Sequence, residues 1–349
     1  MSVRDALYER VQEAGAEAFL VSAPANVRYL SGFSSPEDGV VVLLPERTIL
    51  ITDGRYLAQA DEESTVEVVI ARPWQEWLAA TLQGVRLAVE ADHMTLATYE
   101  QLSQELGHCP VRVSGLVEGH RLIKYEVEIA HLRRAAEITD AAFDHILEVI
   151  RPGIQEVEIS LELERHMRLC GADSSSFDPI VASGPRSAMP HGRASQRVLR
   201  TGELVTLDFG AVVSGYHSDM TRTLALGKIS AQHTALYDAV LTTQTEAIAA
   251  VVPGARGAEL DRLARDRLAE QGLAEYFAHS LGHGVGLQIH EGPRLSQRFD
   301  DLLMPGMVIT IEPGVYIPGD VGVRIEDLLA VTQEGTEVLS KSEKGLIQL

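Results

Sequence analysis

The first 121 residues alternate between short apolar runs and segments in which apolar residues recur at helical spacing. Helical spacing at 3–14 and 56–63 predicts amphipathic helices with one buried face. Compact apolar runs predict strands at 18–22, 40–44, 47–52 and 66–71, and further alternation follows at 85–90, 96–106 and 111–113. This pattern predicts a small mixed α/β domain at residues 1–121.

The remainder of the chain carries one pattern twice. A polar break at 118–124 marks the domain boundary, so the second domain is expected to span residues 122–349. Pro152-Gly153 and Gly171 each end a helical segment, and Pro253-Gly254 and Gly272 do the same 101 residues later. The predicted helices are 126–151, 157–170, 232–252 and 258–271. Each helix pair precedes a loop and a hairpin, so we expect a duplicated unit whose two hairpins meet.

The first hairpin is predicted at residues 204–224, with Ser214-Gly215 in the turn between two alternating strands. A turn centred between Val213 and Ser214 would place Asp208 almost directly opposite Asp219. Carboxylates facing each other at about 5 Å repel, and like charges in this position weaken a sheet. A cation between the two strands would reverse that effect.

The second hairpin repeats this arrangement at 308–314 and 322–327. Glu312 and Glu326 are equidistant from Gly319, so this turn can also place two carboxylates opposite each other. One acid near a strand end is usually a solvated side chain. That interpretation does not explain why acids recur in both copies of an apolar strand, so we interpret the four acids as candidate metal ligands.

A histidine among glycines, His283, can complete the cluster, although a loop histidine with only a structural role is an alternative. Four carboxylates and one imidazole, without thiolates, suit manganese, cobalt or zinc better than calcium or a structural zinc site. Four carboxylates carry enough charge for two divalent ions, which can lower the pKa of a shared water toward about 7. His191 and His290 are candidate donors to a developing oxyanion. Arg324 is a candidate ion-pair partner for a neighbouring carboxylate.

Composition excludes several other functions. The formal charge is −20 and no basic patch is visible, which disfavours nucleic-acid binding. No apolar run approaches the roughly 18 residues that a membrane helix needs, and residues 1–15 lack the features of a secretion signal. The two cysteines, Cys109 and Cys170, are typical of a reducing compartment. We therefore expect a cytoplasmic protein without a membrane partner.

Five motifs, in order, resemble the Xaa-Pro branch of the pita-bread metallopeptidases, which contains aminopeptidase P and prolidase. The stretch from His279 to Glu291, HSLGHGVGLQIHE, resembles the family signature. The others are LDFG at 207–210, SDMTRT at 218–223, IEPG at 311–314 and VRIED at 323–327. YLSGF at 29–33 and TDGRY at 52–56 resemble the N-terminal domain of small bacterial members. The resemblance thus implies a small α/β domain before a pseudo-twofold duplicated α+β pita-bread catalytic domain.

The resemblance also implies a role for each candidate residue. Asp208 would bind one metal ion, His283 and Glu312 the other, and Asp219 and Glu326 would bridge both. Glu312 would also accept a proton from the water that becomes the metal-bridging hydroxide, and would deliver that proton to the leaving nitrogen. His191 and His290 would hold the scissile carbonyl and its oxyanion, and Arg324 would fix the carboxylates. The ions are expected to be manganese, with cobalt or zinc as alternatives.

The implied activity is removal of an N-terminal residue from a following proline, with an Xaa-Pro aminopeptidase favoured over an Xaa-Pro dipeptidase. A dipeptidase needs a group that binds the C-terminal carboxylate, for which the candidates are Arg28, Arg47, Arg55 and Arg72. Methionine aminopeptidase shares the five ligands, but the N-terminal domain and Pro190-His191-Gly192 disfavour it. A peptide-binding module without catalysis is disfavoured because His191, His290 and Glu312 are all present. The family also implies a homodimer.

Overall fold

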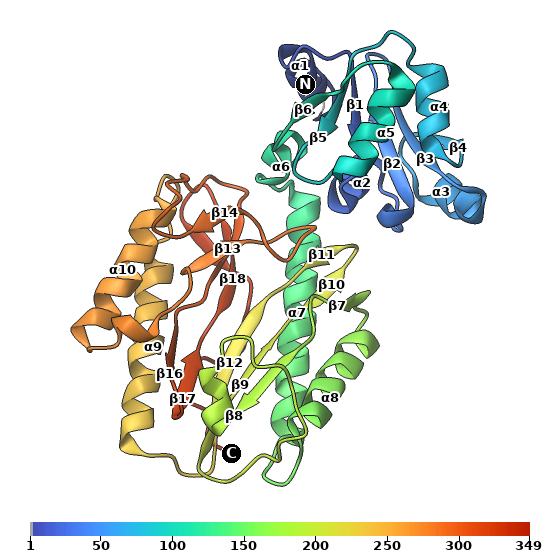
Figure 1. Cartoon of the computed structure of the whole chain (residues 1–349). Helices are drawn as coiled ribbons and strands as arrows, with labels where there is room; N and C mark the ends of the chain where they lie inside the picture. The colour runs from blue at the N-terminus through green and yellow to red at the C-terminus, as the bar shows by residue number, and fades with distance from the viewer. Residues whose placement is uncertain (1–2) are drawn as a thin grey trace. The chain divides into compact units, whose positions relative to one another are not determined.

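The computed structural model describes residues 3–349 and divides the chain into two units, Met1–Arg121 and Leu122–Leu349 (Figure 1). The first unit is built on one six-stranded sheet with the order β4-β3-β2-β1-β5-β6. Its strands are β1 (Ala18–Val21), β2 (Gly39–Leu43), β3 (Thr48–Thr52), β4 (Glu67–Ile70), β5 (Leu87–Glu90) and β6 (Val111–Val113). Its α-helices are α1 (Val3–Glu13), α2 (Pro24–Ser31), α3 (Leu57–Glu63), α4 (Trp74–Thr81), α5 (Leu96–Leu106) and α6 (Leu116–Arg121).

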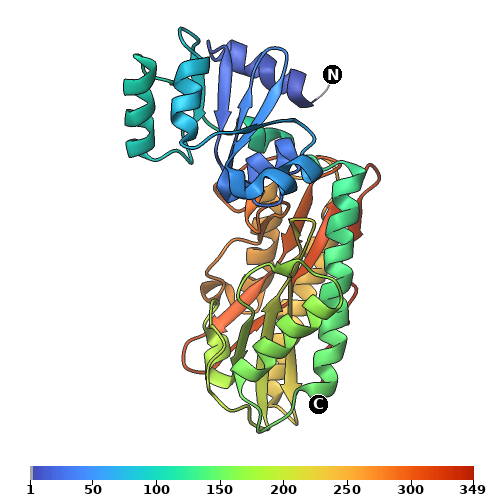
Figure 2. The ribbon, with the colours of Figure 1, turned by 90° about the vertical axis from the view of Figure 1, so that its right-hand side faces the viewer.

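Helices cover both faces of this sheet (Figure 2). Phe19 and Val41 pack with Leu7 of α1, whereas Leu20 and Val42 on the other face pack with Leu78 of α4. Successive residues of a strand point to opposite faces, so a strand covered on both sides must be apolar throughout. This explains why β1 and β2 read as continuous apolar runs.

The predicted strands and helices of the first unit are present, with ends shifted by one or two residues. Three short helices, α2, α4 and α6, were not predicted. The first two begin at or directly after a proline, Pro24 and Pro73, a residue that suits the first turn of a helix. Helix α6 lies partly in the polar stretch at 118–124.

The second unit carries the duplicated pattern. Helices α7 (Glu126–Val149) and α8 (Glu156–Leu169) lie on one side of the strands, and α9 (Ala231–Ala249) and α10 (Gly257–Glu270) lie on the other (Figure 1). The first half supplies β7 (Ser174–Ser175), β8 (Ile180–Ser183), β9 (Glu203–Phe209), β10 (Ala211–Val213), β11 (Tyr216–His217) and β12 (Met220–Leu226). The second supplies β13 (Gly282–Gly284), β14 (Glu291–Leu295), β15 (Val308–Ile311), β16 (Gly314–Ile317), β17 (Val321–Arg324), β18 (Asp327–Val331) and β19 (Thr336–Val338). The strands of the first half pack mainly against α7 and α8, and those of the second half mainly against α9 and α10. Helix α7 also packs against strands of the second half through Leu132 and Ala136, so the two halves share part of the core.

Each hairpin is interrupted in the middle, where a pair of strands ends and a second pair begins. In the second half, β15 pairs with β18 and β16 pairs with β17. Ile311 lies opposite Asp327 and Gly314 opposite Arg324, so the register is centred on Gly319 as predicted. Glu312 and Glu326 occupy matching places between the two ladders.

The register predicted for the first hairpin is wrong, because the turn is centred one residue further along the chain than predicted. Asp208 lies opposite Thr221, and Asp219 lies outside the ladder, directly before β12. The turn is centred on Ser214-Gly215, and both residues have positive φ, 50° and 81°. A two-residue turn of this kind needs positive φ at both central positions, which fixes the turn there rather than between Val213 and Ser214.

Within residues 3–349, none of the helices has the length and apolar character required to cross a bilayer.

Candidate metal centre

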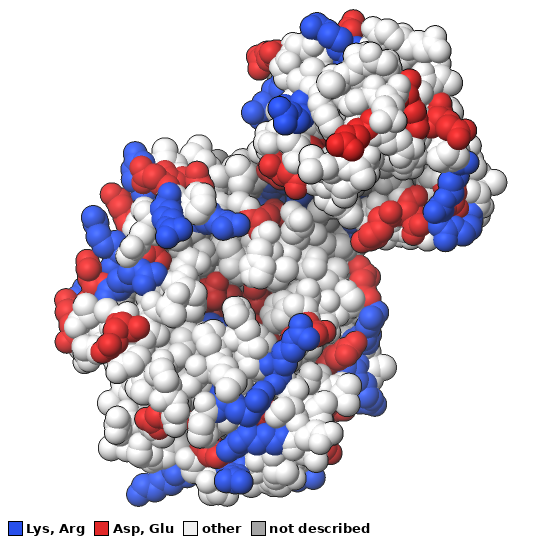
Figure 3. All heavy atoms as spheres, viewed as in Figure 1, with Lys and Arg blue, Asp and Glu red and all other residues white. Residues whose placement is uncertain are grey.

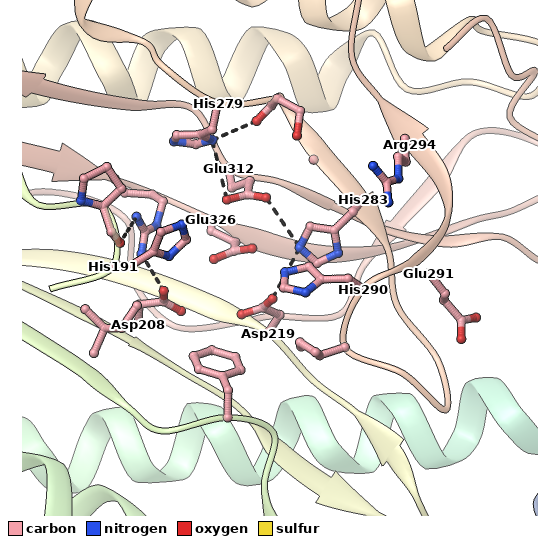
Figure 4. Close-up of a pocket in the computed structure, with 17 residues that line it drawn as sticks. His191, Asp208, Asp219, His279, His283, His290, Glu291, Arg294, Glu312 and Glu326 are labelled. Atoms are coloured by element: carbon pink, nitrogen blue, oxygen red, sulfur yellow. Dashed lines mark hydrogen bonds and ion pairs between the residues drawn. The ribbon is translucent and has the colours of Figure 1, made fainter. Parts of the chain in front are cut away.

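A cavity of about 500 Å³ opens where the two hairpins of the second unit approach each other. Asp208, Asp219, Glu312 and Glu326 all line it, together with His283 (Figure 4). Figure 3 shows acidic side chains at the bottom of a hollow in this unit. The structure therefore brings together the five residues that the sequence predicts as metal ligands.

The interruptions in the hairpins explain how the acids reach the cavity. Asp208 is near the end of β9, and Asp219 precedes β12. Glu312 follows β15, and Glu326 lies between β17 and β18. A residue at a break in a ladder is released from the strict alternation of a strand. Strands from both halves can thus direct acids to one point.

The distances among these groups suit a shared cation. His283 Nε2 lies 3.6 Å from Asp219 Oδ2 and 3.5 Å from Glu312 Oε1. Ligand atoms of Asp219, His283 and Glu326 all lie within 4.8 Å of one another. Among residues 3–349, no hydrogen-bond partner is found for the buried oxygens Asp208 Oδ1, Asp219 Oδ1 and Glu326 Oε1. Buried polar atoms are nearly always satisfied, so these oxygens fit a metal ion.

The electrostatics of the cavity support the same conclusion. Burial, followed by the charge of Glu326, raises the pKa of Asp219 well above its usual value. Burial and the charge of Asp208 raise the pKa of Glu326 to about 8, and burial with the charge of Glu326 raises that of Glu312. These carboxylates oppose one another's ionisation, and a bound cation would relieve that repulsion.

The imidazole of His283 is held in its neutral form. Burial and the neighbouring His290 lower its pKa to about 4. Its Nδ1 lies 3.1 Å from the carbonyl oxygen of Gly284, so Nδ1 carries the proton and the lone pair of Nε2 faces the acids. Its backbone N–H donates to Thr310 Oγ1 at 3.1 Å. Both contacts orient the ring for metal binding.

Arg324 links the two halves behind the acids. Its guanidinium forms an ion pair with Asp208, and its Nε donates to Thr221 Oγ1 at 2.9 Å. The hydroxyl of Thr221 in turn donates to Glu326 Oε2 at 2.6 Å. Arg324 also donates to the carbonyl oxygen of Pro190 at 3.1 Å, directly before His191. The predicted ion pair is therefore present.

His191 and His290 lie at the more exposed part of the cavity. The rings of His290 and His283 meet edge to face, with centroids 4.4 Å apart. Burial, then the charge of His191, lowers the pKa of His290. Both imidazoles can reach a molecule in the cavity, and their role as oxyanion donors remains a prediction.

Among the residues that line the cavity, His279 and Arg294 were given no role by the sequence analysis. His279 accepts from the hydroxyl of Tyr316 at 3.0 Å, and its Nδ1 lies 3.9 Å from Glu312 Oε2. Arg294 in β14 lies opposite His283 in β13. The sequence did contain a signal for Arg294, because this residue follows His290 by four positions, at the end of the glycine-rich stretch.

Arg28, Arg47, Arg55 and Arg72, named from the sequence as candidates to bind a substrate carboxylate, are not among the described residues that line this cavity. All four belong to the first unit. Arg47 pairs with Glu67 at 3.3 Å, and Arg55 and Arg72 both pair with Asp53. The sequence alone could not show which arginine lines the cavity, because segments far apart in the chain form it.

Comparison with known proteins bears on the whole chain. Residues 130–333 match metallopeptidase family M24, and residues 4–123 match the Creatinase/Prolidase N-terminal domain. An Xaa-Pro dipeptidase of Pyrococcus horikoshii is 39% identical over 333 residues, which cover 95% of this chain and 94% of the relative. The structure of an Xaa-Pro dipeptidase from Bacillus anthracis is 46% identical and covers 99% of each chain, with a TM-score of 0.95. An X-Pro aminopeptidase structure from Thermotoga maritima is 35% identical, with a TM-score of 0.91, and the match covers 97% of this chain and 100% of that one.

These matches confirm the family and the fold predicted from the motifs, a small α/β domain before a pita-bread catalytic domain. They also confirm a metal-dependent peptidase, in agreement with the unsatisfied oxygens of the cavity. The chain belongs to metallopeptidase family M24.

Proposed function

We propose that this protein is an Xaa-Pro dipeptidase, a prolidase that cleaves dipeptides with proline in second position. The sequence prediction placed an Xaa-Pro aminopeptidase first. The relatives described as Xaa-Pro dipeptidases support the dipeptidase alternative better. The observation that carries the proposal is Arg294, a cation in the lining of the cavity that contains the acids.

Arg294 suits recognition of a free carboxylate. Among the described residues, its guanidinium contacts the ring of Phe299, 5.4 Å from the centroid, and forms no ion pair. In a dipeptide, the C-terminal carboxylate follows the scissile bond by one residue, a span of roughly 3.5 Å. A longer peptide places a neutral amide there and loses the charge-assisted hydrogen bond. An arginine at this place therefore favours dipeptides.

The metal ligands in this proposal are Asp208, Asp219, His283, Glu312 and Glu326, which together would hold two divalent ions. Manganese is the proposed metal because hard oxygen donors with a single imidazole suit it. When bound, such ions polarise a carbonyl and make water a better nucleophile. Arg324 keeps Asp208 in place, and Thr221 keeps Glu326 in place.

Three residues act on the substrate itself. Glu312 accepts a proton from the attacking water and delivers it to the leaving nitrogen of proline. His191 and His290 donate to the scissile carbonyl oxygen as negative charge develops there. The nitrogen of an Xaa-Pro bond has no hydrogen, so the cavity need not supply an acceptor for one. Phe177, Ile180 and Ile289 offer apolar surface to the proline ring.

The test compares Leu-Pro with Leu-Pro-Gly as substrates of the manganese-loaded protein. We expect kcat/KM for Leu-Pro to exceed that for Leu-Pro-Gly by at least about tenfold, the value of one charge-assisted hydrogen bond. Arg294→Gln should remove that preference by raising KM for Leu-Pro, and Arg298→Gln, an exposed arginine in the same region, should not. Equal rates on both peptides would instead establish the aminopeptidase.

Two further features belong to the proposal. A cytoplasmic location is supported by Cys109 and Cys170, which are not joined in a disulfide. A homodimer is expected from the family resemblance, and sedimentation equilibrium of the purified protein tests it directly.

A further inference from the structure

A buried ion pair lies beside the acid cluster and takes no part in it. Lys124 precedes α7, and Glu291 is the first residue of β14. Lys124 Nζ lies 2.9 Å from Glu291 Oε1, and the two side chains are 1% and 8% exposed. Figure 4 shows Glu291 directed away from the four acids. Burying two charges is unfavourable unless geometry compensates, so a buried pair is weak evidence of a role in stability.

Lys124 is fixed by its own backbone as well as by its side chain. Its N–H donates to the carbonyl oxygen of Gly306 at 2.8 Å. A Cβ on Gly306 would lie 3.1 Å from the carbonyl oxygen of Lys124, so the two segments pack closely. The ammonium is thus presented from a rigid position, next to the start of a 24-residue helix.

Glu291 closes the loop that contains His290. Its Oε2 accepts from the N–H of Gln288 at 3.3 Å. Its carboxylate also packs against Gly286, where a Cβ would lie only 2.4 Å from Oε1. Residues 285–290 form no regular helix or strand, so this carboxylate is one of the contacts that define the loop. Holding the carboxylate therefore holds the residue before it, His290.

We propose that Lys124 is a positioning residue for His290, acting through Glu291. The inference rests on the proposed function, in which His290 donates to the scissile carbonyl oxygen. Donors in an active site must be held within a fraction of an ångström, and supporting contacts outside the site provide that precision. The pair supplies this support because both side chains are largely buried, and a charged hydrogen bond is stronger where little water surrounds it.

The test is a double-mutant cycle between Lys124 and His290 in the full-length, manganese-loaded protein. Lys124→Met retains the aliphatic chain and removes the ammonium. We expect it to lower kcat for Leu-Pro about 10–100-fold, with KM changed less than threefold. In a His290→Ala background, the same substitution should lower kcat less than threefold, because its effect passes through the missing imidazole. Arg133→Met serves as control: Arg133 is on α7, pairs with Glu337 at 3.0 Å and is not among the described residues that line the cavity.

Calorimetric titration with Mn²⁺ and thermal melting separate positioning from general damage. We expect manganese affinity within threefold of wild type, and Lys124→Arg should recover part of kcat. The inference would be overturned if the fold-losses in kcat of the two single mutants multiplied in the double mutant. A Lys124→Met protein with wild-type kcat would also overturn it. If Lys124→Met does not fold, the same cycle with Glu291→Gln decides between these outcomes. A wild-type protein inactive on all Xaa-Pro peptides would instead refute the proposed function.

Discussion

At the scale of single residues, the most informative feature is the set of buried oxygens without partners. Asp208, Asp219 and Glu326 are each less than a tenth exposed, and each leaves one oxygen unsatisfied among residues 3–349. Burial raises the pKa of all three, and repulsion from neighbouring carboxylates adds to this effect at Asp219 and Glu326. Such a cluster destabilises the metal-free fold and becomes favourable only when a cation is bound.

Asp219→Asn therefore has opposite effects with and without metal. In metal-free protein, loss of one repelling charge should raise Tm, while the gain in Tm on adding Mn²⁺ should shrink. The kcat/KM for Leu-Pro should fall by more than about 100-fold. Substituting a residue that only supports a metal ligand usually costs about 10–100-fold, so a larger loss is expected for a ligand itself. Scanning calorimetry and kinetic assays measure both, with the exposed Asp238→Asn as control. A metal-free variant that melts below wild type would contradict this account of the cluster.

At the scale of elements, the interrupted hairpins determine where the acids point. Gly210 lies at the interruption between β9 and β10, where a Cβ would lie only 1.9 Å from the carbonyl oxygen of Ser218. The chain that follows Asp208 thus approaches the segment directly before Asp219 more closely than any residue with a side chain would allow. Gly284 has the same role in β13, where a Cβ would lie 1.8 Å from the carbonyl oxygen of Gly292.

Gly210→Ala should separate the two strands and displace both aspartates. Overpacking of this kind costs about 1–3 kcal/mol, which lowers Tm by several degrees. Thermal melting should show that loss together with weaker Mn²⁺ binding by calorimetry. Gly54→Ala is the matched control, since a Cβ at Gly54 meets no atom within 4 Å. Equal melting temperatures for the two variants would show that the close approach is not needed.

The sequence predicted the strands and the acids because apolar alternation and the duplicated acids are local signals. The first turn was misplaced because a two-residue turn depends on φ at Ser214, a backbone angle that composition does not reveal. Arg294 and Lys124 were missed for a different reason. Arg294 faces His283 only through the pairing of β13 with β14, whose register the glycine-rich sequence does not reveal. Lys124 pairs with Glu291, 167 residues further along the chain, so only the tertiary structure shows that contact.

At the scale of the whole molecule, the chain consists of two units with separate cores. The cores of the first unit contain residues of Met1–Arg121, and those of the second contain residues of Leu122–Leu349. The acids and His283 all belong to Leu122–Leu349. A ligand stabilises only the structure that binds it, so metal should act on this unit.

Scanning calorimetry with and without Mn²⁺ tests this division. At 100 times Kd, one bound ion contributes about 2.7 kcal/mol, which corresponds to roughly 5–10 °C for a domain of 150–250 residues. We expect two transitions in metal-free protein and an upward shift of the larger one alone. A shift of equal size in both would show that the first unit also contributes to metal binding.

The most direct measurement of the central claim is the number of Mn²⁺ ions bound by the metal-free protein, determined by isothermal titration calorimetry. Two hairpins that present four carboxylates, together with the imidazole of His283 in β13, should bind two ions per chain. Asp219→Asn should weaken the binding of both, because in the proposed arrangement Asp219 would bridge them. A wild-type protein that binds no manganese, or an Asp219→Asn protein that binds two ions with unchanged affinity, would contradict the account.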